Sequence, residues 1–400
     1  MNRFFITDEK TILEGRTTDI YFLRTREILQ KKGVHKHVRA EFTVSRLPGG
    51  YEWAVFAGLE EVLKLLEGKP IDLYALPEGT IFTSRDVQGI TVPVMFIEGD
   101  YVDFAIYETP VLGFICQSSG IATKSARVRV AAGDSLVLSF GIRRMHPAIA
   151  PLIDRNAYIG GCDGVSSIVG AETIGQPPKG TMPHALMIMM GEEEAWKAYD
   201  EIMPPEVPRI VLIDTFGDEK WEAIKAAQIV KDIIGVRLDT PGSRKGNFPD
   251  IIREVRWELD VRGFRNVQIF ISGGLDEHSI PPLKEAGAVA FGVGTSISNA
   301  PTIDYAMDIV AVEGKPLAKK GKFGGIKRVK RCSNCGRYHV LKPGEDTDRC
   351  TVCGGELVDV HEKYIEKGKI IRDLPSVDEI RNYVLDQIKR FDLKIERKPT

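Results

Sequence analysis

Between residues 112 and 300, short apolar runs alternate with amphipathic stretches, and no other feature of the sequence restricts the fold as much. Each apolar run ends in a polar or glycine-rich turn, as a strand does when a helix follows it. Repeated units of this kind place their strands side by side in a parallel sheet. About seven strands without a Rossmann glycine fingerprint favour an irregular α/β barrel over an open, doubly wound sheet. The predicted strands are 136–140, 157–161, 185–190, 210–213, 235–238, 267–271 and 288–292, and the predicted helices are 193–202, 218–233, 249–262 and 278–286.

The parts of the chain on either side of the predicted barrel follow different patterns. Residues 1–112 mix helical spacing, as at 51–66, with short β-rich runs, which predicts an N-terminal α/β domain of β-rich, hybrid character. The barrel itself is expected to occupy residues 113–312. Residues 313–400 are expected to form a third part, in which a basic linker and a cysteine module precede a helix at 376–390.

The composition excludes a disordered chain and a general polycation, because 43% of the residues are hydrophobic and the formal net charge is only −2. No run approaches the roughly 18 consecutive apolar residues of a membrane span, so no membrane partner is expected. The first residues run directly into the acidic Thr7-Asp8-Glu9 without a signal-peptide pattern. A cytoplasmic location is therefore the expectation.

Four cysteines near the C-terminus form two Cys-x-x-Cys pairs, Cys332 with Cys335 and Cys350 with Cys353. Each pair can form a tight turn whose amides point at the sulfur atoms, and four thiolates suit a tetrahedral zinc ion. Because four thiolates fill the coordination sphere, the predicted zinc knuckle is structural rather than catalytic. Eight basic residues and no acid lie just before it, between 315 and 331, as in a solvated linker, a loop that approaches phosphate or an RNA-binding segment.

Polar residues gather where the predicted strands end, and these ends share one face of a parallel barrel. Phe140 offers an aromatic face, and Arg143 with Arg144 can grip a carboxylate or phosphate, although two surface arginines are the alternative. Asp214 and Asp239 can position ribose hydroxyls or a hydrated Mg²⁺, although each also suits a helix N-cap. Further polar residues at these ends are Asp163, Arg237, Ser272 and Thr295.

Two glycine-containing loops follow consecutive strands near the end of the predicted barrel, where backbone amides commonly hold a phosphate. One contains Gly273 and Gly274, and the other contains Gly292 and Gly294. His184 ends a turn-rich loop just before an apolar run. On its own, a histidine in that place is more often structural than catalytic.

In their order along the chain, these motifs resemble those of archaeal-type nicotinate phosphoribosyltransferases, whose kin are the nicotinamide and quinolinate enzymes. The resemblance covers most of the chain and implies the type II phosphoribosyltransferase barrel. The residues that carry it are Thr18-Asp19-Ile20-Tyr21, Glu108-Thr109-Pro110, Phe140-Gly141-Ile142-Arg143-Arg144, Asp163-Gly164, Gly180-Thr181-Met182-Pro183-His184, Asp214, Arg237-Leu238-Asp239-Thr240-Pro241-Gly242, Ser272-Gly273-Gly274 and Gly292-Val293-Gly294-Thr295.

The resemblance implies that nicotinate and phosphoribosyl pyrophosphate give nicotinate mononucleotide and pyrophosphate in NAD biosynthesis, with Mg²⁺ and coupled ATP hydrolysis. It implies a homodimer, or a higher oligomer, with shared sites in which Tyr21 of one subunit and Phe140 of the other sandwich the pyridine ring. His184 matches the family histidine that ATP phosphorylates. The resemblance also implies that Arg143 lies at the nicotinate carboxylate or at the ribose phosphate end, and that Asp163 lies near the ring. It implies that Arg237 and Asp239 contact the ribose and pyrophosphate and that Asp214 helps to organise the Mg²⁺ site. The 5-phosphate is the implied ligand of Gly273, Gly274, Gly292 and Gly294.

Two departures from the family pattern bear on this expectation. Bacterial and eukaryotic relatives often have an acid after the histidine, whereas Ala185 follows His184 here, which affects how tightly ATP is coupled. The cysteine module is absent from many relatives, so its role does not follow from them. One interpretation is that the module pins the C-terminal segment to the barrel and that chelation loosens this tail.

Three alternatives to nicotinate transfer stay open. Nicotinamide is one possible base. Quinolinate is another; it carries two carboxylates and loses one as CO₂, and the cations Arg143, Arg144 and Lys179 do not exclude it. The third is a zinc-containing barrel that acts on tRNA, because a basic run precedes the cysteines. The net charge of −2 and the scarcity of aromatic residues in that run make nucleic acid the weaker expectation.

Overall fold

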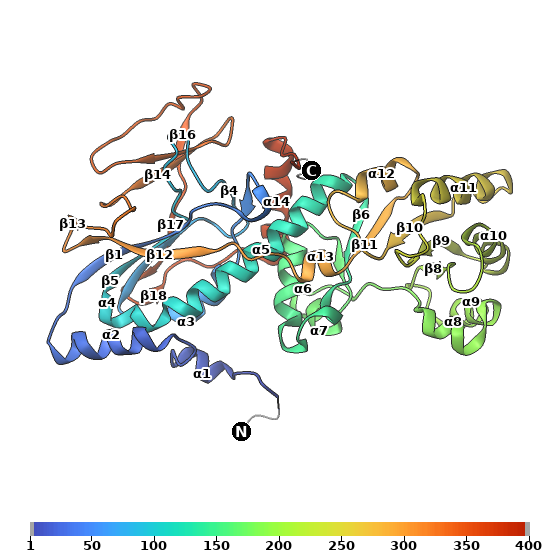
Figure 1. Cartoon of the computed structure of the whole chain (residues 1–400), viewed down its shortest axis with the longest axis horizontal. Helices are drawn as coiled ribbons and strands as arrows, with labels where there is room; N and C mark the ends of the chain where they lie inside the picture. The colour runs from blue at the N-terminus through green and yellow to red at the C-terminus, as the bar shows by residue number, and fades with distance from the viewer. Residues whose placement is uncertain (1–3, 397–400) are drawn as a thin grey trace. The chain divides into compact units, whose positions relative to one another are not determined.

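The computed structural model describes residues 4–396. Contacts divide the chain into two compact units, one with the chain up to Thr123 and Pro301–Glu396, the other with Lys124–Ala300 (Figure 1). Residues 313–400 were expected as a separate third part, whereas their described portion packs into the first unit. Within the described range, no helix combines the length and the apolar character that a membrane crossing requires.

The first unit is built on a seven-stranded antiparallel sheet with the order β13-β12-β1-β5-β3-β17-β18. Its strand β1 (His37–Val44) pairs with β5 (Met95–Asp100) on one side and with β12 (Tyr305–Val312) on the other. The sheet therefore joins strands from both ends of the sequence. The other helices and strands of this unit are α1 (Glu9–Leu13), α2 (Ile20–Lys31), β2 (Ala54–Val55), α3 (Leu59–Leu66), β3 (Ile71–Ala75), β4 (Ile81–Phe82), α4 (Tyr101–Phe104), β13 (Lys315–Pro316), β14 (Arg328–Cys332), β15 (Tyr338–Leu341), β16 (Leu357–Asp359), β17 (Glu362–Glu366), β18 (Lys369–Ile370) and α14 (Val377–Arg390).

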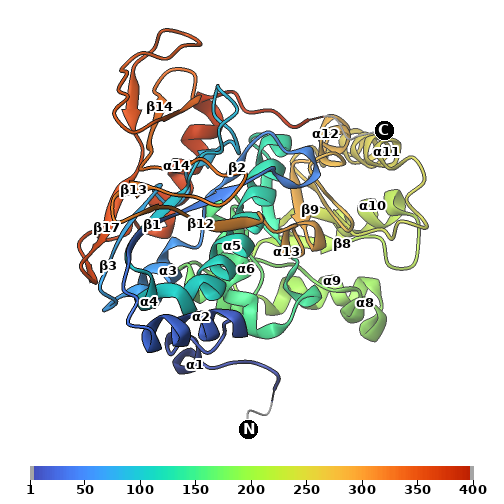
Figure 2. The ribbon, with the colours of Figure 1, turned by 60° about the vertical axis from the view of Figure 1, so that its left-hand side comes forward.

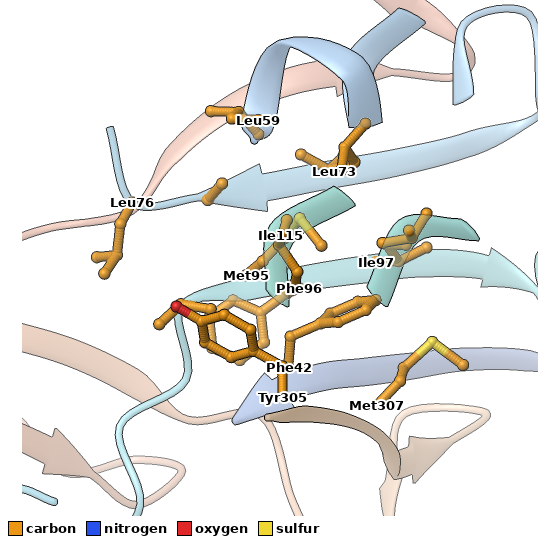
Figure 3. Packing of buried hydrophobic residues seen from close by; sticks show 14 of the residues in the cluster. Phe42, Leu59, Leu73, Leu76, Met95, Phe96, Ile97, Ile115, Tyr305 and Met307 are labelled. Atoms are coloured by element: carbon orange, nitrogen blue, oxygen red, sulfur yellow. The ribbon is translucent and has the colours of Figure 1, made fainter. Parts of the chain in front are cut away.

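The core of the first unit lies between one face of this sheet and helices α3 and α5 (Glu108–Ala132) (Figure 3). Phe42 and Leu73 are fully buried there, and the ring of Tyr305 stacks on that of Phe82 with centroids 6.0 Å apart. Helix α5 carries apolar and small residues all round its surface rather than on one side. Without a one-sided pattern, the sequence gives no period by which to recognise a helix of this kind.

The predicted helix at 51–66 is correct only in its second half. Gly58 has φ = +95°, a left-handed conformation that a helix interior does not contain, so α3 begins at Leu59. The preceding residues Ala54 and Val55 instead pair with β4 as a short antiparallel ladder.

The second unit contains a six-stranded, wholly parallel sheet with the order β7-β6-β11-β10-β9-β8. This is the predicted α/β fold in the form of a half-barrel, since β7 and β8 are the two edges of the sheet. Helices α9 to α12 follow one another along it, each in contact with the next (Figure 1). The elements are β6 (Leu136–Ser139), α6 (Ala150–Ile159), β7 (Gly164–Val165), α7 (Ile168–Thr173), α8 (His184–Met190), α9 (Glu192–Ile202), β8 (Arg209–Leu212), α10 (Glu219–Ile229), β9 (Ile233–Leu238), α11 (Phe248–Val261), β10 (Gln268–Ser272), α12 (Ile280–Glu285), β11 (Ala290–Val293) and α13 (Thr295–Ser298).

Two of the seven predicted strands are wrong. Residues 157–161 lie mostly in α6, which starts near Pro151 and gives way to Gly161 with φ = +118°. Residues 185–190 form α8, because their alanine, leucine and methionines favour a helix and Gly191 ends it. Short apolar runs do not distinguish a strand from a buried helix, and the actual strand β7 is only two residues long.

The cysteine segment folds as a three-stranded sheet, β15-β14-β16, with α14 beside it (Figure 2). The hydroxyl of Tyr338 donates to the carbonyl of Ile81 (3.0 Å), and the amide of Val340 donates to Asp86 (2.9 Å). Arg331 donates to Gln387 of α14 (2.8 Å). In these contacts the module holds the C-terminal segment to N-terminal residues of the same unit.

Much of the basic run that precedes the cysteines is engaged in ion pairs. Lys319 and Lys322 both reach the buried Asp308, at 2.6 and 2.7 Å. Lys327 is itself buried and pairs with Glu41 at 2.7 Å. These charges are compensated within the fold, which leaves fewer cations for an RNA backbone and weakens the tRNA alternative.

Candidate functional site

The carboxyl ends of the parallel strands surround a cavity of about 300 Å³. Eleven of the residues that the sequence singles out line it, and three others, Ser166, Gly180 and Thr181, complete the wall. Because the strands are parallel, their ends meet at one edge although their sequence positions are far apart. The predicted residues that line the cavity are Phe140, Arg143, Arg144, Arg237, Asp239, Ser272, Gly273, Gly274, Gly292, Gly294 and Thr295.

Arg237 and Asp239 form the polar centre of this cavity at the end of β9. The guanidinium of Arg237 contacts Asp239 (3.2 Å), the hydroxyl of Ser272 (3.1 Å) and the hydroxyl of Thr181. The Ser272 hydroxyl in turn donates to the other oxygen of Asp239 (2.7 Å). Each group fixes the next, so a cation and a carboxylate are held in defined positions beside the space for a ligand.

His184 lies next to Asp214, which follows β8. Their closest atoms, Nε2 and Oδ1, are 3.2 Å apart, and the histidine side chain is partly exposed whereas the carboxylate is buried. The other oxygen of Asp214 accepts from the amide of Asp239 (2.5 Å) and the hydroxyl of Thr240 (3.0 Å). Burial raises the pKa of Asp214, and these hydrogen bonds and the histidine oppose the rise. Oδ1 of Asp214 lies at ion-pair distance from Nε2 of His184 but makes no hydrogen bond in the described part of the chain, so the histidine ring is next to a buried carboxylate oxygen that no donor satisfies.

The ring of Phe140 lies close to the backbone at Gly292, where a Cβ would stand 2.5 Å from the ring. Only glycine leaves this ring its place in the cavity. Arg143 and Arg144 belong to a 3-10 turn, Ile142–Arg144, and both side chains are exposed. Their guanidinium groups are therefore at the solvent side of the cavity, accessible to an anion.

The glycine loops offer backbone amides to this cavity. Gly273 and Gly274 both have positive φ, and a Cβ on Gly273 would stand 3.0 Å from Asp239. In the part of the chain that the structure describes, the amides of Gly274 and Thr295 have no protein acceptor. Free amides that converge beside a cation are the arrangement that binds phosphate.

A second cavity of about 370 Å³ adjoins the first and shares Phe140, Thr181 and Arg237 with it. Its remaining lining is mostly apolar, with Leu138, Ile210, Phe270 and Phe291 among it, and Lys179 stands at its exposed rim. The region thus combines a polar compartment with an apolar, partly aromatic one.

Four predicted site residues line neither cavity: the neighbouring His184 and Asp214, and also Asp163 and Tyr21. Asp163 pairs with Arg129 and accepts from the amide of Val137 (2.8 Å), at the start of β6 rather than at its end. Tyr21 belongs to the first unit, where it is 56% exposed on α2. There the motifs of Asp19 and Thr109 meet, since the Asp19 amide donates to the Thr109 hydroxyl (3.2 Å).

Ser166 and Thr181 line the cavity but were not among the site residues predicted from the sequence. Ser166 follows β7, a strand of two residues that is too short to recognise from the sequence. Gly164, the first residue of that strand, was part of a motif. Thr181 was part of the motif that ends at His184, so its presence in the motif was the available signal. Its hydroxyl contact with Arg237 joins positions 56 residues apart, which no local pattern shows.

Glu222 holds the loop that follows Asp214, and a second acidic side chain, Glu192, lies beside Glu222. Buried Glu222 accepts from the amides of Thr215 (3.3 Å), Phe216 (3.1 Å) and Gly217. Burial, then the adjacent Glu222 carboxyl, raises the pKa of Glu192 to about 7. Glu192 is the first residue of α9, directly after the helix of His184, and Glu222 belongs to α10, which follows Asp214. The pair therefore joins the segment after His184 to the segment after Asp214.

The four cysteines meet as the sequence predicts. Their sulfur atoms all lie within 4.8 Å of one another, with 3.5 Å between Cys332 and Cys353 and 3.7 Å between Cys335 and Cys350. A tetrahedron with metal–sulfur bonds of about 2.3 Å has edges of about 3.8 Å, so the spacing fits zinc. The amides of Cys335 and Val352 point at sulfur atoms, as in a knuckle. Among residues 4–396, no other group of three or more His, Cys, Asp and Glu side chains converges in this way.

Comparisons with known proteins agree along the whole chain. Sequence models of the N-terminal and C-terminal domains of quinolinate phosphoribosyl transferase match residues 19–119 and 121–308, and the C-terminal domain of nicotinate phosphoribosyltransferase matches residues 328–399. The crystal structure of a nicotinate-nucleotide pyrophosphorylase from Pyrococcus furiosus is also similar. The two sequences are 53% identical, and the TM-score is 0.94 over 99% of this chain and 100% of that one.

More distant relatives are also similar. A nicotinate phosphoribosyltransferase of Bacillus subtilis is 28% identical over 93% of this chain and 88% of its own length. The structure of human nicotinic acid phosphoribosyltransferase, 18% identical, shares the fold with a TM-score of 0.72 over 93% of this chain and 94% of that one.

Proposed function

Because the chain belongs to the nicotinate/quinolinate phosphoribosyltransferase family, we propose that it converts nicotinate and phosphoribosyl pyrophosphate to nicotinate mononucleotide and pyrophosphate. The observation that carries the proposal is the pair of adjoining cavities, one polar and one apolar, with Phe140 and Arg237 common to both. The polar cavity suits a phosphorylated sugar, and the apolar one suits an aromatic base. A reaction between the two occurs where the cavities meet.

The reaction is a displacement at the anomeric carbon, in which the pyridine nitrogen attacks as pyrophosphate leaves. No general base is needed for this nitrogen. The protein must orient the ring, stabilise the departing anion and exclude water. In this proposal Phe140 stacks on the base, Arg237 and Asp239 position the ribose and the leaving group, and the glycine loops hold the 5-phosphate.

Mg²⁺ would assist the departure of pyrophosphate by neutralising its charge. Asp214 is buried with one oxygen doubly hydrogen-bonded, whereas Asp239 lines the cavity. The fit therefore favours an ion held chiefly by phosphate oxygens with Asp239 nearby, and leaves Asp214 beside His184.

ATP coupling is proposed to act through His184. Its ring is partly exposed and lies beside the buried Asp214, which suits a nitrogen that accepts a phosphoryl group. The phosphoryl group becomes bonded to nitrogen as ADP leaves, and its later hydrolysis favours product formation. Because Ala185 stands in place of an acid, we expect ATP hydrolysis to be coupled to product formation more weakly than in bacterial relatives.

A homodimer with shared sites is part of the same proposal. Ile20, Tyr21 and Ile28 are 56%, 56% and 60% exposed on α2, an apolar surface that a second copy would cover. Tyr21 would then reach the base held on Phe140 of the partner copy.

Quinolinate is the second candidate base. The observations that favour it are the Pyrococcus structure, named a nicotinate-nucleotide pyrophosphorylase, and the exposed cations Arg143, Arg144 and Lys179 near the cavities. A dicarboxylate needs more positive charge than nicotinate does, and these three side chains supply it.

The experiment measures pyrophosphate release from phosphoribosyl pyrophosphate and Mg²⁺ with nicotinate, nicotinamide or quinolinate supplied separately, each with and without ATP. Release with nicotinate, stimulated by ATP, supports the proposal. Release only with quinolinate, accompanied by CO₂, supports the second candidate. No release with any base contradicts both.

A further inference from the structure

Asp154 is a fully buried acid on helix α6 that lines neither cavity. Its two oxygens accept from two serine hydroxyls, Oδ1 from Ser139 at 3.2 Å and Oδ2 from Ser167. These serines belong to different segments, since Ser139 is the last residue of β6 and Ser167 is the N-cap of α7. One carboxyl group therefore ties the end of β6 to the segment that follows β7.

Each of these serines is next to a residue that lines the polar cavity. Phe140 follows Ser139, and Ser166 precedes Ser167. The two segments also share a backbone bond, in which the amide of Ser166 donates to the carbonyl of Ser139 (3.1 Å). Because the side chain of Asp154 supports this bond from behind, the positions of Phe140 and Ser166 depend on it.

The surroundings of the Asp154 carboxyl group leave it little freedom. A Cβ on Gly170 would stand 2.4 Å from Oδ2, so helix α7 approaches the carboxyl group as closely as only a glycine permits. The Ser167 hydroxyl that donates to Asp154 also accepts from the amide of Gly170 (2.9 Å). Burial raises the pKa of Asp154, and the hydrogen bonds from Ser167 and Ser139 oppose the rise. A buried acid is costly compared with an apolar side chain of similar size, and this one directs both oxygens at the segments that carry the cavity wall.

We propose that Asp154 is a positioning residue that acts through Ser139 and Ser167 to set where Phe140 meets the base. The inference rests on the proposed function for the identity of the base and for the role of Phe140. A misplacement of about 1 Å in a group that orients a substrate can cost about 100-fold in rate. The groups proposed to hold the donor lie at the end of β9, which two strands separate from β6, so the role of Asp154 concerns the base.

The experiment compares variants of the full chain that break or keep the two ties. Asp154→Ala removes both ties, and Asp154→Asn keeps the shape and two polar atoms that can bond the serines. Ser167→Ala removes one tie only and keeps the test open if Asp154→Ala does not fold. The matched control is Asp200→Ala, which removes the partner of the buried Arg209 (3.1 Å) in the same unit and lines neither cavity.

Three measurements are made on each variant. Thermal unfolding gives its stability. Hydrogen exchange is followed at the amides of Phe140 and Ser166, which donate to the carbonyls of Val293 and Ser139. Turnover with nicotinate and phosphoribosyl pyrophosphate gives kcat and a KM for each substrate.

We expect Asp154→Ala to raise exchange at Phe140 and Ser166 by about tenfold relative to Asp200→Ala. The KM for nicotinate should rise about tenfold and kcat should fall by a similar factor, while the KM for the donor changes less than about twofold. Asp154→Asn should restore most of the loss, and Ser167→Ala should fall between the two. Asp200→Ala should lose thermal stability without any of these changes.

Unchanged exchange at Phe140 and Ser166 in Asp154→Ala would overturn the inference, whether or not the protein uses nicotinate. An equal rise in the KM for the donor, or the same kinetic change in Asp200→Ala, would also overturn it, because the effect would then be a general loss of stability. An equal loss in Asp154→Asn would contradict positioning by hydrogen bonds. Wild-type protein that releases no pyrophosphate with any base contradicts the proposed function alone, and the exchange measurement still decides whether Asp154 positions Phe140.

Discussion

The four-cysteine cluster and the carboxyl edge of the parallel sheet both gather reactive side chains, but in opposite states. In the cluster, four sulfur atoms lie within 4.8 Å of one another, and neighbouring amides already point at them. At the sheet edge, the exposed Arg143 and Arg144 and the free amide of Gly274 surround an open cavity.

The difference teaches how each region is used. A set of groups whose only ligand would be one enclosed ion serves stability, because the free energy of binding that ion contributes to folding. A set held rigidly by a second layer of contacts, but left unsatisfied toward solvent, serves a ligand. In the second region that layer consists of Ser272, Thr181 and Asp214, whose hydrogen bonds fix Arg237 and Asp239.

Disruption of the four-cysteine cluster should have the largest effect and should be confined to stability. Structural zinc contributes about 10 kcal/mol to the folding of small modules. We expect Cys335→Ser combined with Cys350→Ser to lose one zinc per chain and to raise amide exchange at Val340 and Ile81 by more than about 100-fold, since the Val340 amide donates to Asp86 and the Ile81 amide donates to Gln387 of α14. The measurements are metal analysis and hydrogen exchange.

The control for this variant is Cys116→Ser, which changes a cysteine outside the cluster. The KM for phosphoribosyl pyrophosphate should change less than about threefold in either protein. Retention of metal by the double variant would show that the four cysteines are not the metal site. The contrast between this cluster and the carboxyl edge of the parallel sheet would then no longer hold.

Arg237→Met should have the next largest effect, this time on catalysis. Arg237 faces the cavity and also fixes Asp239, so its loss removes charge stabilisation where pyrophosphate departs. We expect kcat/KM for pyrophosphate release to fall by about 10³-fold with little change in thermal stability. Arg253→Met, which removes an exposed arginine of a surface ion pair on α11, should stay within about twofold. A loss of less than tenfold in Arg237→Met would contradict the role of this residue.

The same contrast explains how much the sequence could predict. The four cysteines form a local pattern, so their spacing alone indicated the cluster. The parallel sheet was predictable from its alternating pattern, and that topology brought eleven of the predicted residues to one cavity. Helix α5 was missed because its apolar residues lie all round it and give no one-sided pattern. Strand β7 was missed because it has only two residues.

Contacts between distant positions were beyond prediction. The pairing of His184 with Asp214 and the contacts of Asp154 with Ser139 and Ser167 depend on how helices and loops meet in the whole fold. Asp163 shows the opposite case, since a motif placed it in the site and the structure uses its carboxylate to hold Arg129.

His184→Ala should have a smaller effect that concerns ATP alone. If ATP acts through this histidine, the variant should lose an ATP stimulation of about tenfold and should no longer take up the γ-phosphoryl group of labelled ATP. Asp214→Asn should act in the same direction, because Asp214 lies beside the ring. His146→Ala is the control, since His146 is an exposed histidine that caps a 3-10 turn. Full ATP stimulation in His184→Ala would place this residue among the structural groups.

The smallest expected effect concerns the acidic pair behind the site. The pKa of Glu192 is about 7 in the folded chain, above its ordinary value of 4.5, so the folded state binds this proton more tightly than the unfolded state does. Its contribution to stability is therefore fully present below pH 4.5 and is lost as the pH rises through about 7. Above that pH, the Glu192 and Glu222 carboxylates repel each other, and Lys225, 3.8 Å from Glu192, compensates only in part.

Glu192→Gln replaces the bound proton with a permanent neutral amide. We expect its free energy of unfolding to exceed that of the wild type by about 1 kcal/mol at pH 8 and to equal it near pH 5, in urea unfolding at both values. Glu193→Gln, at an exposed neighbouring carboxylate, should show no such pH dependence. A gain at pH 8 would mean that the Glu192–Glu222 pair near the open site lowers the free energy of unfolding at that pH. The four-cysteine cluster, in contrast, is expected to raise it. Equal stability at both pH values would remove that contrast between the two regions.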